Sequence, residues 1–338
     1  KIDYDKCVSC GMCLVNCPFG AISDKSQIFQ LIQAIKRGDK VVAAVAPAFV
    51  SQFGENVTSS QMREAMRQVG FHKVIEVAVG ADMCTAEEAE DFLKKVPAEQ
   101  PFMATSCCPS WSVMAKKLFP QFKDYISMAM TPMVLTARLY KKDHPDVRIV
   151  FIGPCTAKKL EASRRTVRSD VDFVLTFEEM QGIFDAKGIV PAEMPVDPEE
   201  EFGTGTALGR GFAVTGGVAN AVKEAIAELD PDREVKVEHA VAKSVADVIH
   251  AKYPDKEVKI ANAEGLKECR QLLKMATLGK YNGYLLEGMA CPGGCVAGAG
   301  TITPVKKSTA AVGKYVAGAK VRTIQDSAAV KRLREVQD

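Results

Sequence analysis

Three short cysteine motifs, each directly after a strand-like apolar run, are the feature that most restricts how this chain can fold. Residues 105–111 read Thr-Ser-Cys-Cys-Pro-Ser-Trp, residues 153–161 read Gly-Pro-Cys-Thr-Ala-Lys-Lys-Leu-Glu, and residues 287–295 read Glu-Gly-Met-Ala-Cys-Pro-Gly-Gly-Cys. In open parallel sheets, ligands bind at the carboxyl ends of the strands. The three motifs can therefore converge on one crevice of an α/β fold.

Apolar runs and helical periodicity predict strands that alternate with helices. We expect strands at 41–50, 74–79, 102–106, 147–152, 173–176, 212–215, 235–242 and 284–286. We expect helices at 59–69, 85–95, 111–118, 177–187, 217–228, 243–252, 263–276 and 326–336. This alternation predicts an α/β fold with mostly parallel sheets flanked by helices.

A boundary inside this α/β domain is also expected. Residues 188–211 are rich in Pro, Glu and Gly and are typical of a surface connection between two lobes. The domain would then span 40–338, with lobes at roughly 40–187 and 205–338. A capping box from Thr85 to Glu88 is expected to open the helix that precedes the first motif.

Composition excludes several classes of protein. The chain has 338 residues, 47% of them hydrophobic, and a net charge of +2, which favours a protein with a large core and gives no sign of nucleic-acid binding. No apolar run is long enough to span a membrane, and no signal peptide is evident, although the chain begins at Lys1. We therefore expect a cytoplasmic protein. Four histidines without a His-x-x-x-His pattern argue against a His-based metal site.

Residues 1–28 form a separate segment. Cys7, Cys10, Cys13 and Cys17 have the C-x2-C-x2-C-x3-C-P spacing of a bacterial ferredoxin half, which predicts an accessory 4Fe–4S cluster. A structural zinc site is the alternative. In two-cluster ferredoxins the fourth cysteine of such a run binds the other cluster. The last cysteine here either closes a local cluster or has lost an upstream partner half.

The three later motifs supply enough thiols for a second cubane. Adjacent thiols are poorly suited to share one cluster, so one of the pair Cys107–Cys108 is left free to move protons. Buried free cysteines are the plainer alternative for the motif cysteines. Cys84 and Cys269 lack Pro or Gly neighbours, and we expect both to be core or surface residues without a ligand role. The four thiols that suffice for a cubane are Cys108, Cys155, Cys291 and Cys295.

These three motifs resemble, in order, the signature motifs of the FeFe-hydrogenases, and the resemblance covers nearly the whole chain. It implies two lobes that close on a buried H-cluster. That cofactor is a 4Fe–4S cubane joined through one cysteine sulfur to a two-iron subsite with CO, cyanide and azadithiolate. The implied reaction is the reversible reduction of protons to dihydrogen, with electrons from a ferredoxin-type partner through the accessory cluster. Maturation proteins and an anaerobic setting are implied as well.

The resemblance also implies a role for each motif residue. Cys108, Cys155 and Cys291 would bind the cubane, and Cys295 would bind it and bridge to the two-iron subsite. Cys107 would be the proton-shuttling thiol. The remaining cofactor contacts would come from Lys158, which would donate to a cyanide, and from Met289, Pro47 and Ala48.

Protons need a path from solvent to Cys107, through groups within hydrogen-bond reach of one another. Glu88 and Asp91, three residues apart on one helix, resemble the relay carboxylates of the family. Ser127 and Glu161 stand at matching positions further along. The plainer alternatives are a capping role for Glu88 and a solvated surface charge for Asp91.

Some residues near the motifs depart from the commonest family pattern. Gly153 stands where Met is usual, Met133 where Gln is common and Ala48 where Ser is common, and residues 296–300 lack the usual Gly-rich run with Gln. The chain therefore resembles the branch often called group B. Loss of donors and a thioether is expected to alter potentials and inhibitor sensitivity.

Two other functions remain open at the level of sequence. Some relatives of the family are non-enzymatic iron–sulfur assembly factors, and others are hydrogen sensors with low turnover. Cys107 together with Lys158 favours the enzyme, because assembly factors lack the paired cysteines and the complete second motif, and sensors often lack the shuttle cysteine.

Overall fold

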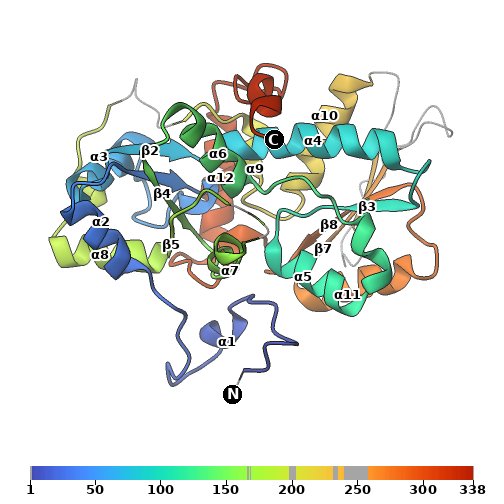
Figure 1. Ribbon diagram of the computed structural model, residues 1–338, viewed down its shortest axis with the longest axis horizontal. Helices are drawn as coiled ribbons and strands as arrows, with labels where there is room; N and C mark the ends of the chain where they lie inside the picture. Colours follow the sequence, from blue (N-terminus) through green and yellow to red (C-terminus); the bar gives the residue numbers. More distant parts are fainter. Residues whose placement is uncertain are drawn as a thin grey trace.

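Two four-stranded parallel sheets form the body of the protein and lie at opposite sides of the view in Figure 1. The α/β class expected from the sequence is therefore confirmed. Among the described residues, no helix is long and apolar enough to cross a membrane. The computed structural model describes residues 2–165, 167, 169–197, 203–230, 235–239 and 258–337.

The first sheet has the strand order β2–β1–β4–β5. Its strands are β1 (Val41–Val45), β2 (Lys73–Glu76), β4 (Arg148–Gly153) and β5 (Phe173–Thr176). All five residues of β1 are buried, because helices cover the sheet and share its apolar core. These helices are α2 (Ile28–Lys36), α3 (Ser59–Val69), α6 (Pro132–Asp143) and α8 (Phe177–Lys187).

The second sheet has the order β3–β8–β7–β6. Its strands are β3 (Phe102–Ala104), β6 (Val235–His239), β7 (Val258–Glu264) and β8 (Tyr284–Met289). Alternate residues of β8 enter two different cores, Leu285 on one face and Leu286 on the other. The first face packs against α4 (Ala78–Lys95) and α10 (Gly217–Leu229), and the second against α5 (Pro109–Leu118) and α11 (Leu266–Ala276).

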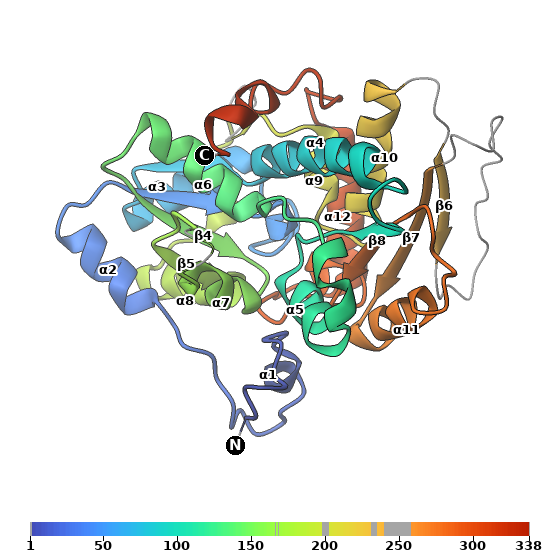
Figure 2. The same cartoon turned by 45° about the vertical axis from the view of Figure 1, so that its right-hand side comes forward.

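The sheets do not follow the expected lobe boundaries. Helix α4 carries the chain from β2 in the first sheet to β3 in the second (Figures 1 and 2). Later, α12 (Val305–Ala317) returns and packs Val312 into the core of the first sheet. The expected lobes of 40–187 and 205–338 therefore need correction, since β3 and α5 belong with the second sheet and α12 with the first. This crossing places the first motif opposite the second.

The helix before the first motif starts earlier than expected. α4 begins at Ala78, so the expected strand 74–79 ends at Glu76 and the capping box is wrong. Thr85 lies inside the helix, where its hydroxyl donates to the carbonyl of Ala81 at 2.8 Å. In the first turn of α4, Gly80 lets this helix approach α6 closely: a Cβ there would lie 2.9 Å from the backbone nitrogen of Thr136.

Other expected elements also need correction. Residues 212–215 form a turn rather than a strand, residues 258–264 are a strand although 263–264 were expected to be helical, and 326–336 contain only the 3₁₀ helix Val330–Glu335. The expected helix 243–252 lies outside the described residues. Besides α2, α6 and α12, the sequence did not predict α7 (Ala157–Ser163) or α9 (Ala207–Gly211). The connection 188–211 is not all surface, because residues 205–207, 209 and 210 are buried.

A buried polar cluster fixes α9 and α12 to the first sheet. Glu76, at the end of β2, pairs with Arg210 of α9 (Oε1–Nε 2.8 Å) and accepts a hydrogen bond from the hydroxyl of Tyr315 at 2.6 Å. The guanidinium of Arg210 lies 4.1 Å from the centre of the Tyr315 ring. Nearby, the carboxylate of Asp82 accepts hydrogen bonds from the hydroxyl (2.6 Å) and amide (3.0 Å) of Thr206. These contacts therefore fix α9 and its N-cap against the end of β2 and the first turns of α4.

Asp82 makes the stability of the fold depend on pH. Burial raises the pKa of this carboxyl from 3.8 to about 7, although the hydrogen bonds from Thr206 oppose the rise. Between these values the folded state binds the proton and the unfolded state releases it. The free energy of unfolding therefore falls as pH rises from about 4 to about 7, by roughly 2–4 kcal/mol for this group.

Asp82→Asn is expected to remove this part of the pH dependence, because the amide stays neutral throughout. Urea unfolding of the cofactor-free protein at several pH values between 4 and 8 measures the difference between wild type and variant. Asp91→Asn is the matched control, since Asp91 is partly exposed and paired with Lys95. Equal pH slopes for wild type and Asp82→Asn would refute the assignment.

Candidate functional site

A cavity lies where the carboxyl ends of the two sheets face each other. Segments that follow β1, β4, β3 and β8 line it. In the first sheet it lies beside the neighbouring strands β1 and β4, whose chain connections lead to opposite edges through β2 and β5. Such a switch point is the usual ligand site of a parallel sheet. The three cysteine motifs converge there as the sequence predicts.

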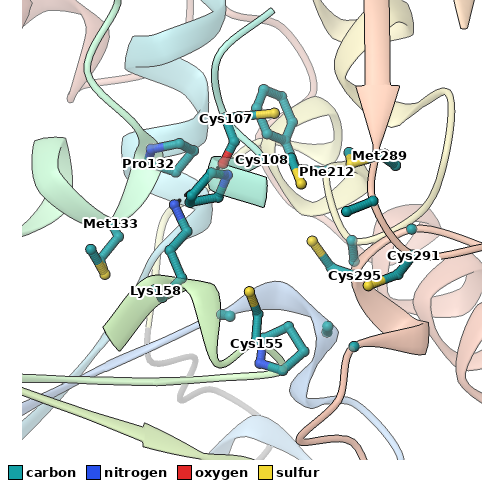
Figure 3. Close-up of a pocket in the computed structure, with 18 of the residues that line it drawn as sticks. Cys107, Cys108, Pro132, Met133, Cys155, Lys158, Phe212, Met289, Cys291 and Cys295 are labelled. Carbon is teal, nitrogen blue, oxygen red and sulfur yellow. Dashed lines mark hydrogen bonds between the residues drawn. The ribbon is translucent and has the colours of Figure 1, made fainter. Parts of the chain in front are cut away.

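Five thiols of the motifs line this cavity. Figure 3 shows the sulfur atoms of Cys108, Cys155, Cys291 and Cys295 directed toward a common space, and the sulfur of Cys107 apart from them. The division of the adjacent pair follows from local structure. Cys108 is the N-cap of α5, and Cys107 precedes it in the turn after β3.

The donor set fits an iron–sulfur cluster. Within the described part of the chain, no three His, Cys, Asp or Glu side chains are arranged to hold a single metal ion. A four-iron cluster is wider than one ion, so its thiolates stand farther apart. Burial raises the pKa of Cys155 to about 11 and of Cys295 to about 12, so a bound cation would be needed to hold them as thiolates. Backbone amides point at Cys108 and Cys155, as at cluster sulfurs.

Lys158 borders the cavity from α7. Its ammonium donates to the carbonyl oxygen of Cys107 at 3.3 Å and pairs with Glu161 at 2.6 Å, and both ionic side chains are nearly buried. Burial opposes the charged form, but the pair with Glu161 raises the pKa of Lys158 on balance. The structure thus provides a buried cation at the cavity wall, and it makes Glu161 the partner of that cation.

Glu88 is fully buried next to the double cysteine. One carboxylate oxygen accepts from the amide of Ser106 at 3.2 Å, and the other has no hydrogen-bond partner. Burial raises the pKa of Glu88 to about 8. Burial also raises the pKa of Cys107 well above its usual value, and the charge of Glu88 raises it further. Both groups therefore hold protons near neutral pH.

The other expected relay residues lie near this carboxylate but outside the cavity lining. Ser127 is buried; its hydroxyl accepts from the amide of Ala129 at 3.1 Å and lowers the pKa of Glu88. Asp91 is one turn beyond Glu88 on α4, 28% exposed, and paired with Lys95 at 2.6 Å. Asp91 is therefore partly exposed, whereas Glu88 and Ser127 are buried.

Glu287 was not singled out by sequence reasoning, yet it shapes the site. It is completely buried, and its carboxylate accepts from the amides of Gly216 (2.9 Å) and Ala219 (2.7 Å) at the start of α10. Burial raises its pKa to about 7, and these amides oppose the rise. The sequence did offer one sign of this role, because Glu287 is the first residue of the third motif. Through these bonds the third motif fixes the N-terminus of α10.

The turn before α10 is joined to the cysteine loop of the third motif. The amide of Thr215 donates to Gly293 at 3.3 Å, and the amide of Val296 donates to Ala213 at 3.1 Å. Gly294 has φ +87°, and a Cβ there would lie 2.5 Å from the nitrogen of Thr215, so only glycine fits. This close pairing replaces the expected strand 212–215 and sets Phe212 in the cavity lining, to which Cys107 also belongs (Figure 3).

The remaining expected contacts also border the cavity. Its lining includes Pro47 and Ala48 after β1, and Met289 at the end of β8. Met133, expected as a departure from the common pattern, lines it from α6. Gly153 does not, although Phe151 two residues before it does. Cys84 and Cys269, expected as core or surface residues, are both completely buried in the core and lie outside the cavity lining.

The N-terminal segment is attached to the loops of this site. Lys117 donates to the carbonyl oxygens of Tyr4 (3.0 Å) and Cys7 (2.9 Å), and the hydroxyl of Thr156 donates to Ser9 at 3.2 Å. Figures 1 and 2 show the segment around α1 (Met12–Val15) below the body of the protein. Cys10, the residue after Ser9, is part of the cavity lining itself.

The cysteines of this segment keep the local features of a cluster-binding run. Backbone amides donate to Cys7 (from Ser9, 3.4 Å) and to Cys17 (from Ala21, 3.4 Å). Backbone hydrogen bonds, that of Phe19 first, lower the pKa of Cys17. Such amide donors stabilise cluster thiolates.

Comparison with known proteins agrees with this geometry. The family model "Iron only hydrogenase large subunit, C-terminal domain" matches residues 39–299, and "4Fe-4S binding domain" matches residues 1–23. The chain is 30% identical over 326 residues to the NADP-reducing hydrogenase subunit HndD of Solidesulfovibrio fructosivorans, covering 87% of this chain and 55% of that protein. The chain spans about half the length of the first curated relatives it matches.

Two further likenesses are informative. The apo FeFe-hydrogenase HydA1 from Chlamydomonas reinhardtii has the same fold, with a TM-score of 0.73 at 24% identity over 93% of this chain and 95% of that one. The chain is also 26% identical to the nuclear prelamin A recognition factor of Xenopus laevis, over 89% of this chain and 74% of that protein.

Two parallel sheets that close on a cysteine-lined cavity, with a ferredoxin-like segment attached, define an iron–sulfur protein of the two-lobed α/β class. The chain belongs to the iron-only (FeFe) hydrogenase large-subunit family.

Proposed function

We propose that this chain catalyses the reversible reduction of two protons by two electrons to dihydrogen. The observation that carries the proposal is the division of the five thiols that the three motifs bring to the cavity. Four face one space and suffice for a cubane, and the fifth, Cys107, lies apart from them with buried Glu88 nearby. An iron-binding scaffold alone needs no such thiol and acid. When bound, an H-cluster with its two-iron subsite would supply the redox chemistry.

The protein's own part would be to bind, shield and move protons. Cys108, Cys155, Cys291 and Cys295 would hold the cofactor, with Cys295 also bridging to the two-iron subsite. Lys158 would offer its remaining hydrogen-bonding capacity to an anionic cofactor ligand, because its ammonium is held at the wall by Glu161. Met289, Pro47 and Ala48 would keep the site apolar.

Protons would pass from Asp91 to Glu88 to Cys107, with the hydroxyl of Ser127 beside the carboxylate. This order follows from exposure, since Asp91 is partly exposed and Glu88 is not. A carboxyl with a pKa of about 8 exchanges protons readily near neutral pH. We assign Glu161 to positioning Lys158 rather than to this relay.

Electrons would enter through a 4Fe–4S cluster on the N-terminal cysteine run. The contacts of Lys117 and Thr156 support this route, because they hold the run against α5, whose N-cap is Cys108, and against the loop that carries Cys155. Cys10 lines the cavity, and Cys13 is exposed. A ferredoxin-type carrier would then donate on the exposed side.

A non-enzymatic role in iron–sulfur assembly is the second candidate. It is favoured by coverage, since the chain spans 72% of the cytosolic iron-sulfur assembly component 3 of Bos taurus at 24% identity. Such a role would use the cluster cysteines and leave Cys107, Glu88 and Lys158 without a task.

Hydrogen production separates the two candidates. The protein is produced with and without FeFe-hydrogenase maturation proteins, purified without oxygen, and supplied with reduced methyl viologen. We expect hydrogen evolution only after maturation, and uptake when oxidised viologen and hydrogen are supplied instead. A matured protein with full cluster iron that neither evolves nor consumes hydrogen would contradict the proposed enzyme and favour the assembly role.

A further inference from the structure

The ring of Phe151 covers the backbone of Gly153, the last residue of β4, at the end of the strand that faces the cavity. Side chains two residues apart on a strand point to the same face. A Cβ at residue 153 would lie 2.5 Å from Cζ of Phe151 and 3.3 Å from Cδ1. No residue with a side chain fits at 153 while the ring keeps this place. The ring of Phe151 therefore accounts for the presence of glycine at position 153.

The same ring forms part of the cavity wall. Phe151 is 3% exposed, packs in the core of the first sheet and lines the cavity. Its neighbours on that side are small: Ala44 is its partner in β1, and Ala46 and Ala48 line the cavity after that strand. The ring is therefore the largest side chain beside Ala46, Pro47 and Ala48 in the cavity lining.

The ring also differs in stiffness from the sulfur-containing side chains around it. Met133 and Met289 have three rotatable bonds each and can adapt to an occupant. Phe151 stands on a central strand paired on both sides, by β1 and β5. A rigid ring on a rigid strand therefore fixes the position of the cavity wall, whereas the flexible thioethers of Met133 and Met289 can move aside.

We propose that Phe151 is a specificity-determining residue, whose ring sets the largest ligand that can enter the cavity beside the cofactor. Gly153 serves it by leaving the ring its place. The ligand class is small apolar molecules such as dihydrogen and CO, and the excluded class is their larger analogues. This inference rests on the proposed function, since it requires a cofactor that binds such molecules.

The packing relation is tested first, in the protein without its two-iron subsite. Gly153→Ala is expected to lower the urea midpoint in the wild-type background. In a Phe151→Leu background the same change should have little effect, because leucine ends near the Cδ position. An equal loss in both backgrounds, or none in either, would overturn the packing relation and with it the proposal.

The size limit is tested in the matured enzyme with CO and methyl isocyanide, which differ by one methyl group. Phe151→Leu is expected to raise inhibition by methyl isocyanide relative to CO by about tenfold or more. Phe184→Leu is the matched control, because Phe184 is buried in the same core but does not line the cavity. The ratio should not change in that control.

The outcomes separate this inference from the proposed function. A wild-type enzyme that turns over hydrogen, together with an unchanged inhibitor ratio in Phe151→Leu, overturns the size limit alone. A matured wild-type protein that turns over no hydrogen and binds neither inhibitor contradicts the proposed function and this inference together. If Phe151→Leu is too unstable to mature, Phe151→Met replaces it, with the same expected direction.

Discussion

Cys107→Ser is expected to lower hydrogen turnover by at least about a hundredfold while the cofactor remains bound. A serine hydroxyl is a far weaker acid than a thiol, so the last proton transfer slows. The four thiols that face the common space in Figure 3 are unchanged, so the cofactor is still held. Viologen-coupled hydrogen evolution measures the loss, and infrared spectra of the same sample verify that the cofactor is present.

Cys269→Ser is the matched control for this change. Cys269 is a completely buried thiol, but its sulfur donates to the carbonyl oxygens of Ala263 (3.5 Å) and Met289 (3.4 Å) and does not line the cavity. It should leave turnover within a few-fold of wild type. Wild-type turnover in Cys107→Ser would remove the thiol from the proton path.

Cys155→Ala is expected to abolish the cavity cluster, with a loss of about four iron atoms per chain and of all hydrogen turnover. The thiol follows β4 and faces the other three ligands, and alanine offers no donor in its place. Iron analysis and electron paramagnetic resonance of reconstituted, unmatured protein give the result without any activity assay.

Two control variants show whether the loss of iron in Cys155→Ala is specific to the cavity cluster. Cys84→Ala removes a buried thiol outside the cavity lining and should leave the iron content unchanged. Cys13→Ala should remove the N-terminal cluster and leave the cavity cluster in place, because Cys13 is exposed and outside the cavity. Full iron in Cys155→Ala would show that the cavity thiols are not the ligands.

The cysteine site could be predicted from the sequence because its chemistry is local. Each motif fixes its own turn after a strand, and strand ends of parallel sheets meet at one edge. Glu88 lies next to the double cysteine, as its position relative to that motif indicated, and the alternative capping role is wrong because α4 begins at Ala78. The spacing to the first motif, not the helix start, carried that information.

The parts that the sequence did not predict depend on contacts between distant segments. The turn 212–215 has the apolar, β-branched composition of a strand, but its backbone pairs with Gly293 and Val296 instead. Glu161 carried no local sign that it would pair with Lys158 so tightly, because an i,i+3 pair on a helix is usually solvated. The role proposed for Phe151 depends on which face of β4 its side chain takes, and a nearly all-apolar strand does not reveal this from sequence.

Infrared spectroscopy of the matured protein under CO and under hydrogen is the most direct test of the central claim, that the cavity holds an H-cluster. We predict stretching bands of iron-bound CO and cyanide that change when either gas is added, and that persist in Cys107→Ser. A matured protein that retains its cluster iron but has none of these bands would contradict the claim.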